Sequence, residues 1–581
     1  MAGEGAAPSG RLTRTAAALG RAGGGVGRAV AATRIGRIAA LLALCAVLFL
    51  PGIAALPVTD RDEARYAQAT KQMLESGEFL DIRFQDEPRW KKPVGIYWLQ
   101  AAAVEAAGGP EAAGIWAYRI PSLIGASVGV LATQWALAPL LGPATATLAA
   151  GLAATSMVLG GEANIAKTDA ALFALIALMM GAWIRLLTRD APAGRDGLRA
   201  VLWGALGLAV LVKGPIAPAV LGLTALALAA AERSLRPLAA LGLWSPWPLL
   251  ALLIAGPWFV AIGLLTDGAF YAEALGRDFI GKLREGQEAH GAPPGTYLGI
   301  AWAVFWPWAA LALFAVPWLW AERRRWAVAV LAAWAVPFWI VLEATPTKLP
   351  HYLLPLAPAL AGLVALWLVE GSSAAGRWRR GLAAVLFAAV GGGLAVANLA
   401  LPLWLSGGVS PWGAALALAG LGAVALGTAA LATADRRGAA TAMILAALCL
   451  VPATLQFGLP RAAYAFPSEA MARASAPFAA CAGRPAASQS YREPSLVFLQ
   501  GTGTRLLSVE DAARVLREEP GALVWAEDRR RAALDAALGE DAPALAELAR
   551  VEAFNPNRGS ETVLRLLARR GDPVLAPCGA P

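Results

Sequence analysis

The residues of this sequence that could do chemistry lie in polar segments between long apolar runs. The first such segment, TDRDEARYAQ, places Asp60, Asp62 and Glu63 directly after an apolar run. A carboxylate at the edge of a low-dielectric environment binds protons more tightly than in water and can act as a general base. Helical spacing from Glu63 to Leu80 puts Asp62 and Tyr66 on one face. The alternative is that these acids only cap the N-terminus of an interfacial helix.

Cations form the second group of candidate residues. Lys91 and Lys92 precede a proline at which a helix is expected to begin. They could capture the phosphate of a lipid, or simply extend toward the headgroups. Lys213 is a lone cation within an apolar run, beside a Gly-Pro pair that breaks a helix. Because an ionisable group at that depth is costly, Lys213 is predicted to be functional.

Further ionisable residues lie at the ends of other apolar runs, on the same predicted side of the membrane. They are Glu162, Lys167, Asp169, Arg277, Lys282, His290, Lys348, His351 and Tyr352. Lys167 and Asp169 either pair with each other or face a cavity. The two histidines and the scattered carboxylates could hold a divalent metal, but no close-spaced ligand motif is present. A metal is therefore not predicted.

Composition excludes an ordinary soluble protein. Of 581 residues, 58% are hydrophobic and 15% are charged, against roughly half and a quarter in soluble domains. The apolar residues occur in runs of about twenty, the length that crosses a hydrocarbon core. The net charge of +9 does not indicate nucleic-acid binding, because Lys and Arg lie in short loops between these runs. The chain is predicted to be a polytopic membrane protein.

The alternation of positive loops predicts the orientation of the chain. Thirteen spans are expected near 36–57, 117–139, 143–160, 168–187, 198–212, 214–232, 246–266, 297–320, 326–343, 352–369, 378–403, 411–432 and 437–457. Arg-rich loops recur on alternate sides, so the N-terminus is expected in the cytoplasm of a bacterial inner membrane. This register requires 94–108 to be an interfacial helix. Residues 1–35 are expected to be a disordered tail and 36–457 the transmembrane domain, with 58–116 as its first periplasmic loop.

Residues 458–581 have the composition of a soluble α/β domain, which thirteen spans place in the periplasm. SLVFLQG and ALVWAE are expected to form buried strands. SVEDAARVLREE and the 527–550 stretch are expected to form amphipathic helices, with Ser508 as the N-cap of the first. A disulfide between Cys481 and Cys578 is plausible in a periplasmic domain, and the sequence leaves it open.

Five short motifs, in order along the first 370 residues, resemble those of one family. They are RDEARYA at 61–67, KKP followed by YWL at 91–99, AKTDA at 166–170, LVKGP at 211–215 and TKLPHYLLPLAPAL at 347–360. The set is similar to that of the bacterial aminoarabinose-to-lipid-A transferases and their protein O-mannosyltransferase relatives, which have the GT-C fold. The resemblance implies an all-α polytopic glycosyltransferase. It would take a sugar from a polyprenyl-phosphate donor and pass it to a lipid A-like or other envelope acceptor on the periplasmic face.

The resemblance also implies roles for individual residues. Asp62 matches the catalytic Asp of the first loop, and Asp169 matches a second acidic position. Lys92 resembles the lysine that holds the carrier phosphate, with Lys282 as a second cation. Asp62 would deprotonate or orient the acceptor while the lysines neutralise the departing phosphate. The other residues expected to bind substrate are Glu63, Arg65, Tyr66, Lys91, Lys213, Arg277, Lys348, His351 and Tyr352.

One position departs from the family pattern. In the aminoarabinose transferases a glutamate, which is a metal ligand paired with a later histidine, precedes the phosphate lysine; here the residue is Lys91. The change disfavours both a metal site and aminoarabinose as the sugar. Two alternatives stay open. One is a transporter or flippase of lipid-linked sugars, which would carry polar groups along a path instead of on one side. The other is glycosylation of protein in place of lipid.

Overall fold

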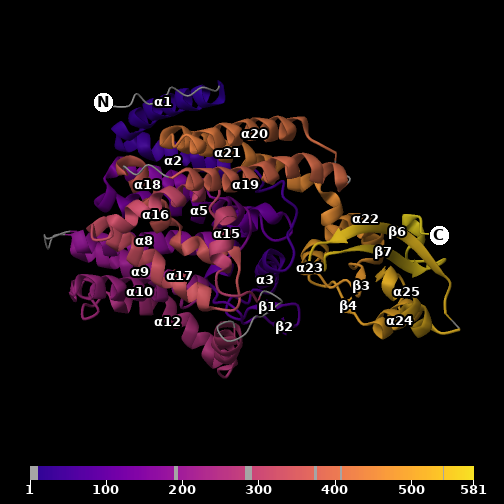
Figure 1. The fold of residues 1–581 in the computed structure, drawn as a ribbon. Helices are drawn as coiled ribbons and strands as arrows, with labels where there is room; N and C mark the ends of the chain where they lie inside the picture. The colour runs from indigo at the N-terminus through magenta and orange to yellow at the C-terminus, as the bar shows by residue number, and fades with distance from the viewer. Residues whose placement is uncertain are drawn as a thin grey trace, which may run out of the picture.

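The structure is a computed structural model that describes residues 11–188, 194–281, 291–371, 376–405, 408–540 and 542–580. Figure 1 shows a bundle of long helices with a smaller, sheet-containing part at one end, near the C-terminus. Helix α3 (Asp62–Ser76) and the hairpin of β1 (Arg83–Phe84) and β2 (Glu87–Pro88) lie between these two parts. The first polar loop of the sequence is therefore at the junction.

Long apolar helices make the chain a multi-pass membrane protein. Among the described residues, eight helical segments are long and apolar enough to cross a membrane. A ninth is formed if the bent pair of α6 (Pro143–Thr155) and α7 (Met157–Ala163) is one span. The eight are α5 (Ile115–Leu141), α8 (Asp169–Thr188), α12 (Pro248–Leu265), α17 (Trp326–Ala344), η3 (Pro350–Leu356) with α18 (Ala357–Glu370), α19 (Arg377–Trp404), α20 (Pro411–Ala432), and α21 (Arg436–Pro452) with η4 (Ala453–Gly458) and η5 (Leu459–Arg461).

The remaining predicted spans contain shorter or more polar helices, so the count of thirteen stays a prediction. These helices are α2 (Arg34–Phe49), α9 (Arg195–Lys213), α10 (Ile216–Glu232), α15 (Thr296–Val304) and α16 (Ala312–Ala321). Short elements connect the bundle: α11 (Arg236–Ala239), α13 (Ala269–Tyr271), η1 (Ala272–Ile280) and η2 (Ala309–Leu311).

Two helix breaks bring backbone groups and charges into the bundle. α6 and α7 meet at an angle of 66°, and Met157 N donates to Trp306 O at 2.9 Å, which satisfies a group freed at the break. α9 ends at Lys213, as its following Gly-Pro pair predicts. Gly214 has a φ of +65°, a conformation that glycine adopts at little cost. The break leaves Lys213 at a helix end inside the bundle.

The first loop folds back against the bundle. α4 (Gly95–Ala106) occupies the stretch predicted to be interfacial, and its 12 residues are too few to cross a membrane. It packs against α3 and α5. Thr70 Oγ1 donates to Gln100 Oε1 at 2.7 Å in a buried contact between α3 and α4. The two helices therefore form a fixed platform for the residues that precede them.

The N-terminal segment is a correction to the sequence prediction. A disordered tail was expected over 1–35, but Arg11–Ala32 form helix α1; residues 1–10 lie outside the described part. α1 packs against α20 and α21. A Cβ at Gly20 would lie 2.7 Å from Gly438 N, so the contact depends on glycine. The small residues that suggest disorder in the sequence instead allow two helices to approach closely.

The C-terminal part contains a mixed five-stranded sheet with helices beside it. Its strand order is β4-β3-β5-β7-β6; β3 is parallel to both neighbours and β7 is antiparallel to both of its own. Ser508 caps its helix as predicted, because its hydroxyl accepts a hydrogen bond from Asp511 N at 3.0 Å. The elements are α22 (Pro467–Ala482), β3 (Ala487–Gln489), α23 (Pro494–Gln500), β4 (Leu506–Leu507), α24 (Val509–Glu518), β5 (Val524–Glu527), α25 (Arg531–Leu538), β6 (Leu545–Asn555) and β7 (Ser560–Arg569).

Two predictions for this part are wrong in detail. SLVFLQG forms helix α23 and not a strand, because Pro494 favours a helix start and the helix packs on α3. The predicted helix over 527–550 is limited to α25, which ends before Gly539 at a φ of +78°. Leu545 then begins β6, which pairs with β7 along its length. ALVWAE contains strand β5 as predicted.

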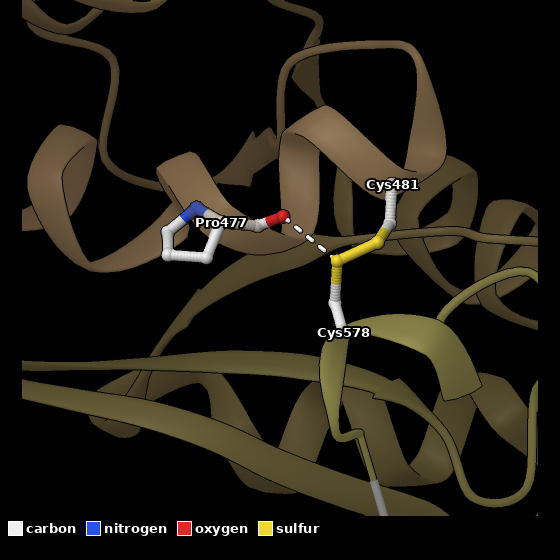
Figure 2. The surroundings of a disulfide bond; sticks show 3 residues. All are labelled: Pro477, Cys481 and Cys578. Carbon is white, nitrogen blue, oxygen red and sulfur yellow. Dashed lines mark hydrogen bonds between the residues drawn. A yellow bond between two sulfur atoms is a disulfide. The ribbon is translucent and has the colours of Figure 1, made fainter.

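A disulfide joins the start and the end of the C-terminal part. Figure 2 shows Cys481 of α22 bonded to Cys578 of the short helix η8 (Ala576–Cys578), beside the carbonyl oxygen of Pro477. The two Cα atoms are 6.3 Å apart and the residues are separated by 97 positions. The bond therefore closes a loop that contains the whole sheet.

Removal of this disulfide is expected to destabilise the C-terminal part. For a loop of about 100 residues the chain-entropy model gives roughly 4.7 kcal/mol, and measured losses are commonly about 2–5 kcal/mol. We expect the double variant Cys481→Ser/Cys578→Ser to be cleaved faster in the C-terminal part by limited proteolysis. Replacement of Cys45, a buried and unpaired cysteine, by Ser tests whether cysteine loss alone matters. Equal cleavage rates for the double variant and wild type would contradict the expectation.

Candidate functional site

A cavity of about 340 Å³ lies where the helix bundle meets the first loop. It is lined by residues from the start of α3, the segment after β2, the turn before α8 with the first residue of α8, the end of α9, the start of η3 with the segment before it, and the turn between β6 and β7. Most of the predicted site residues meet here, namely Asp62, Glu63, Arg65, Tyr66, Lys91, Lys92, Asp169, Lys213, His351 and Tyr352. The structure thus gathers residues that are up to 290 positions apart in the sequence, from Asp62 to Tyr352.

Asp62 offers an accessible carboxylate in this cavity. It is the first residue of α3, and its side chain is exposed. Within the part of the chain that the structure describes, no hydrogen bond or ion pair engages that carboxylate. The preceding residue, Arg61, has a φ of +63°, which is strained for a residue other than glycine. Strain of this kind persists only where the surrounding contacts enforce it.

Glu63 lines the cavity, but its carboxylate is fully engaged by the protein. Arg119 of α5 donates from Nε to Oε1 at 2.7 Å and from Nη2 to Oε2 at 2.9 Å, and neither side chain is exposed. Thr59 and Ala166 donate to the same carboxylate from their backbone N–H groups, at 2.8 and 2.9 Å. Burial alone would raise the pKa of Glu63, but the Arg119 charge and these hydrogen bonds lower it. Glu63 is therefore a permanent anion that fixes the loop.

Arg119 is a residue that supports the site and that the sequence reasoning missed. Its guanidinium also donates to the carbonyl oxygens of Ile53, Leu56 and Pro57, at 3.0, 2.7 and 3.0 Å. It therefore joins the end of α2 to the start of α3. The available signal was its position: an arginine within the apolar run IWAYRIPSL needs a buried partner.

Asp169 and Lys213, which both line the cavity, form a buried ion pair. Lys213 Nζ donates to Asp169 Oδ1 at 2.5 Å. His351 Nε2 is 3.9 Å from the same oxygen, and the Lys213 ammonium lies 5.4 Å from the centre of the Tyr352 ring. Because α9 ends at Lys213, the ammonium of this lysine lies against Asp169, the first residue of α8.

Lys167 has a different partner from the one considered in the sequence. Its ammonium lies 2.9 Å from Glu162 Oε1 and 3.3 Å from His351 Nδ1. The Lys167–Asp169 pair is therefore replaced by two pairs, Lys167–Glu162 and Lys213–Asp169. His351 lies between them and connects both.

Lys92 and Lys213 lie where the polar cavity meets two apolar ones. The first apolar cavity, about 150 Å³, extends between α10, α17 and η3 past Phe338 and Leu342. The second, about 310 Å³, extends past Phe259 and Phe270. Both lysines line all three cavities. The arrangement suits a molecule with an anionic head and long apolar tails.

Two of the predicted residues that the structure describes, Lys348 and Arg277, do not line the cavity. Lys348 donates to the carbonyl oxygens of Leu342, Glu343 and Thr345, at 3.1, 2.9 and 2.6 Å, so it satisfies the last carbonyls of α17. Arg277 of η1 pairs with Glu273 at 3.1 Å and its side chain is 84% exposed. Lys282 lies outside the described residues, as does His290.

The described residues do not fit a metal centre. No group of three His, Cys, Asp or Glu side chains is arranged to hold an ion within the described ranges. The residue before Lys92 is Lys91, a cation that cannot serve as a metal ligand while protonated, and it lines the polar cavity. We therefore derive no step through a metal.

Asp60 connects the cavity to the C-terminal part and is expected to titrate near neutral pH. Its Oδ1 accepts a hydrogen bond from Ser495 N at 3.2 Å. Burial raises its pKa to about 6, helped by the Glu493 carboxylate and opposed by Ser495 and Arg61. An unfolded Asp titrates near 3.9, so the folded state binds the proton more tightly. This contribution to stability is complete below about pH 4 and is lost as pH rises through 6.

The Asp60→Asn variant should therefore gain stability relative to wild type as pH rises from about 4 to 7. The shift of about two pKa units sets a ceiling near 3 kcal/mol, and solvent screening of this partly exposed group reduces the expected gain to about 1–2 kcal/mol. Melting temperatures of both proteins across this range provide the measurement. The exposed Glu540→Gln substitution is the control. A difference between Asp60→Asn and wild type that does not vary with pH would refute the assignment.

Comparison with known proteins identifies the relatives of this chain. No protein-family model matches it. It is 29% identical over 343 residues to the undecaprenyl phosphate-alpha-4-amino-4-deoxy-L-arabinose arabinosyl transferase of Pectobacterium carotovorum, covering 56% of this chain and 58% of the relative. It is 28% identical over 318 residues to a transferase of the same name from Pseudomonas fluorescens, covering 54% of each. The matches thus span a little over half the length of these relatives.

The fold has a counterpart of nearly the same extent. The crystal structure of ArnT from Cupriavidus metallidurans, bound to undecaprenyl phosphate, superposes with a TM-score of 0.72 over 94% of this chain and 100% of that one. The sequence identity is 17%, so this likeness concerns the fold. The resemblance expected from the five motifs is confirmed: this chain is similar in sequence to bacterial aminoarabinose transferases over a little more than half its length, and it has the GT-C fold of ArnT.

Proposed function

We propose that the protein is an integral-membrane glycosyltransferase that moves a sugar from a polyprenyl-phosphate donor to a lipid acceptor of the lipid A type. The observation that carries the proposal is the position of Lys92 and Lys213, where a polar cavity meets two apolar cavities. A lipid phosphate bound there has its charge at the lysines and its chain among apolar side chains. The relatives named above supply the substrate class.

The reaction is a displacement at the anomeric carbon. The acceptor hydroxyl oxygen forms a bond to that carbon, and the bond from the carbon to the phosphate oxygen breaks. Asp62, whose carboxylate is accessible in the cavity, takes the hydroxyl proton. Lys92 neutralises the charge that develops on the departing polyprenyl phosphate. Asp169 is tied to Lys213, so it acts as an electrostatic anchor within the site and not as a free base.

The sugar is set by the polar cavity. Among the described residues that line it, seven are Lys or Arg and four are Asp or Glu. Because Lys91 adds a cation where the relatives carry an acid, the cavity favours a donor with less positive charge than an aminosugar. We therefore expect a neutral or acidic sugar to be transferred faster than aminoarabinose.

We further propose the topology expected from the sequence: thirteen spans, with residues 1–35 in the cytoplasm, 36–457 as the transmembrane domain and 458–581 as a periplasmic domain. The alternation of Arg-rich loops supports it. The disulfide between Cys481 and Cys578 also supports it, because such bonds persist in oxidising compartments. A membrane-impermeant protease added to spheroplasts tests this orientation. It should cleave the C-terminal part only if that part lies on the periplasmic side.

The function is tested with purified protein in lipid nanodiscs. Undecaprenyl-phosphate donors that carry aminoarabinose, a neutral hexose or an acidic sugar are each mixed with lipid A. Mass spectrometry then detects lipid A that has gained one sugar. We expect transfer from at least one donor, and Lys92→Ala to raise the donor KM by about ten- to a hundredfold, the effect of losing a charge-assisted contact. Lys71→Ala, which removes a lysine of α3 outside the cavity, is the control.

Three outcomes would count against the proposal or a part of it. Absence of any sugar transfer with all donors would refute it. Movement of the donor across the bilayer without transfer to lipid A would favour the flippase alternative. Equal KM values for wild type and Lys92→Ala would remove Lys92 from the phosphate site.

A further inference from the structure

The turn between β6 and β7 reaches the proposed catalytic cavity from the C-terminal part. Asn557, in this turn, is the one described residue beyond Tyr352 that lines the cavity. Its carbonyl oxygen accepts a long hydrogen bond from Arg61 Nη2 at 3.5 Å. The cavity wall is therefore shared between the first loop of the membrane part and the far end of the chain.

The turn is held in a defined shape. Asn555 Oδ1 accepts from Asn557 N at 2.9 Å, and Asn555 O accepts from Gly559 N at 2.9 Å. Arg558 donates to both carboxylate oxygens of buried Glu527, at 3.0 and 3.1 Å, and to Ser490 O at 3.1 Å. These contacts fix the turn to β5 and to the loop after β3. Its tip is thus positioned without any contribution from the Asn557 side chain.

The Asn557 side chain is left with unused hydrogen-bonding capacity. Its Nδ2 is buried and has no hydrogen-bond partner among the described residues. A buried donor without a partner costs free energy, so its presence beside a cavity indicates a ligand that completes it. Asn557 itself lines the cavity, so its amide is close to any molecule that binds there. The cationic character of the cavity selects ligands rich in oxygen acceptors.

The C-terminal part also contacts the side chains of the two residues before Asp62. Ser495 N donates to Asp60, and Asn557 O accepts from Arg61. These are the two residues that precede Asp62, and Arg61 has the strained conformation described above. The C-terminal part therefore contacts the segment that carries the proposed catalytic carboxylate at two successive positions.

We propose that the C-terminal part completes the substrate site, with Asn557 as a specificity-determining residue that donates to an oxygen of a bound sugar phosphate. The inference rests on the proposed function and deepens it. Both substrates of that reaction carry a sugar phosphate, namely the polyprenyl-linked donor and lipid A. The shared chemistry is a phosphate or hydroxyl oxygen, and kinetics separate the two sources.

The test compares Asn557→Ala and Asn557→Asp with wild type in the nanodisc assay, with KM measured separately for donor and acceptor. We expect the KM of one substrate to rise about tenfold in Asn557→Ala, and further in Asn557→Asp, which brings a negative charge toward the phosphate. The kcat should change by less than about threefold, because Asn557 does not act on the reacting bond. A rise for the donor alone assigns the contact to the carrier sugar, and a rise for the acceptor alone assigns it to lipid A.

Folding and function are controlled separately. The melting temperature of Asn557→Ala should match wild type, since Asn555 and Arg558 hold the turn. The exposed Glu540→Ala substitution in the same part of the chain is the matched control. Affinities for undecaprenyl phosphate and for lipid A, measured by native mass spectrometry, do not depend on turnover. If wild type transfers no sugar but Asn557→Asp weakens binding of either lipid, the proposed function fails and this inference stands. Unchanged KM values and affinities in both Asn557 variants overturn it.

Discussion

Replacement of Asp62 by Asn is expected to lower kcat for sugar transfer by about 10²- to 10⁴-fold, the usual contribution of a general base. Asparagine has nearly the same shape but cannot accept the proton of the acceptor hydroxyl. Since the Asp62 carboxylate is exposed and makes no hydrogen bond or ion pair to the rest of the described chain, the substitution removes no packing. Melting temperature and the donor KM should therefore stay close to the wild-type values.

The control is Asp86→Asn, which removes an exposed carboxylate from the turn between β1 and β2 of the same loop, outside the cavity. It should retain full activity. Asp169→Asn gives a second comparison, because its partner Lys213 would lose its counter-ion. We expect that variant to lose stability as well as activity. If Asp62→Asn keeps more than about a tenth of the wild-type kcat, Asp62 is not the base.

Replacement of Arg119 by Leu is expected to destabilise the protein by about 3–5 kcal/mol, the range for an ion left alone in a buried pair. Glu63 would keep its buried carboxylate without the guanidinium, and three carbonyl oxygens near the end of α2 would lose their donor. The measurable consequences are a lower melting temperature and a lower yield of folded protein from detergent extracts.

A double variant separates the charge from the packing. Glu63→Gln combined with Arg119→Leu removes both charges, so part of the lost stability should return, and the double-mutant cycle gives the coupling energy. An additive result, with no recovery, would mean that the carbonyl contacts of Arg119 matter more than its pairing with Glu63. Wild-type stability in the single Arg119→Leu variant would contradict the buried ion pair altogether.

The membrane class and the gathering of site residues could be predicted from the sequence because both depend on local patterns. A long apolar run indicates a membrane helix whichever neighbours that helix packs against. The Gly-Pro pair after Lys213 marks a helix end, which explains why that lysine lies at the cavity. Asp62, Lys92 and His351 follow from motifs that stand next to such ends, where polar groups concentrate.

The errors arise where distant contacts override local pattern. α23 is a helix because it packs on α3, more than 400 positions away in the sequence. α1 packs against α20 and α21, and its Gly20 lies directly against Gly438 of α21. Lys348 donates hydrogen bonds to carbonyl oxygens at the end of the preceding helix, α17. The sequence alone does not distinguish such a lysine from one that faces a ligand. Asn557 carries no local signal, since its role depends on where the β6–β7 turn lies.

The placement of that turn also has a consequence for how the protein is made. Ribosomes release the chain from its N-terminus, so every membrane helix emerges before β6 and β7 do. Asn557 can reach the cavity only after both strands have paired, which requires the sheet to assemble around β5. The nascent protein therefore enters the bilayer with an unfinished site. If Asn557 binds substrate as proposed, the substrate site is complete only when this hairpin docks, so chains that terminate before it should bind substrate more weakly.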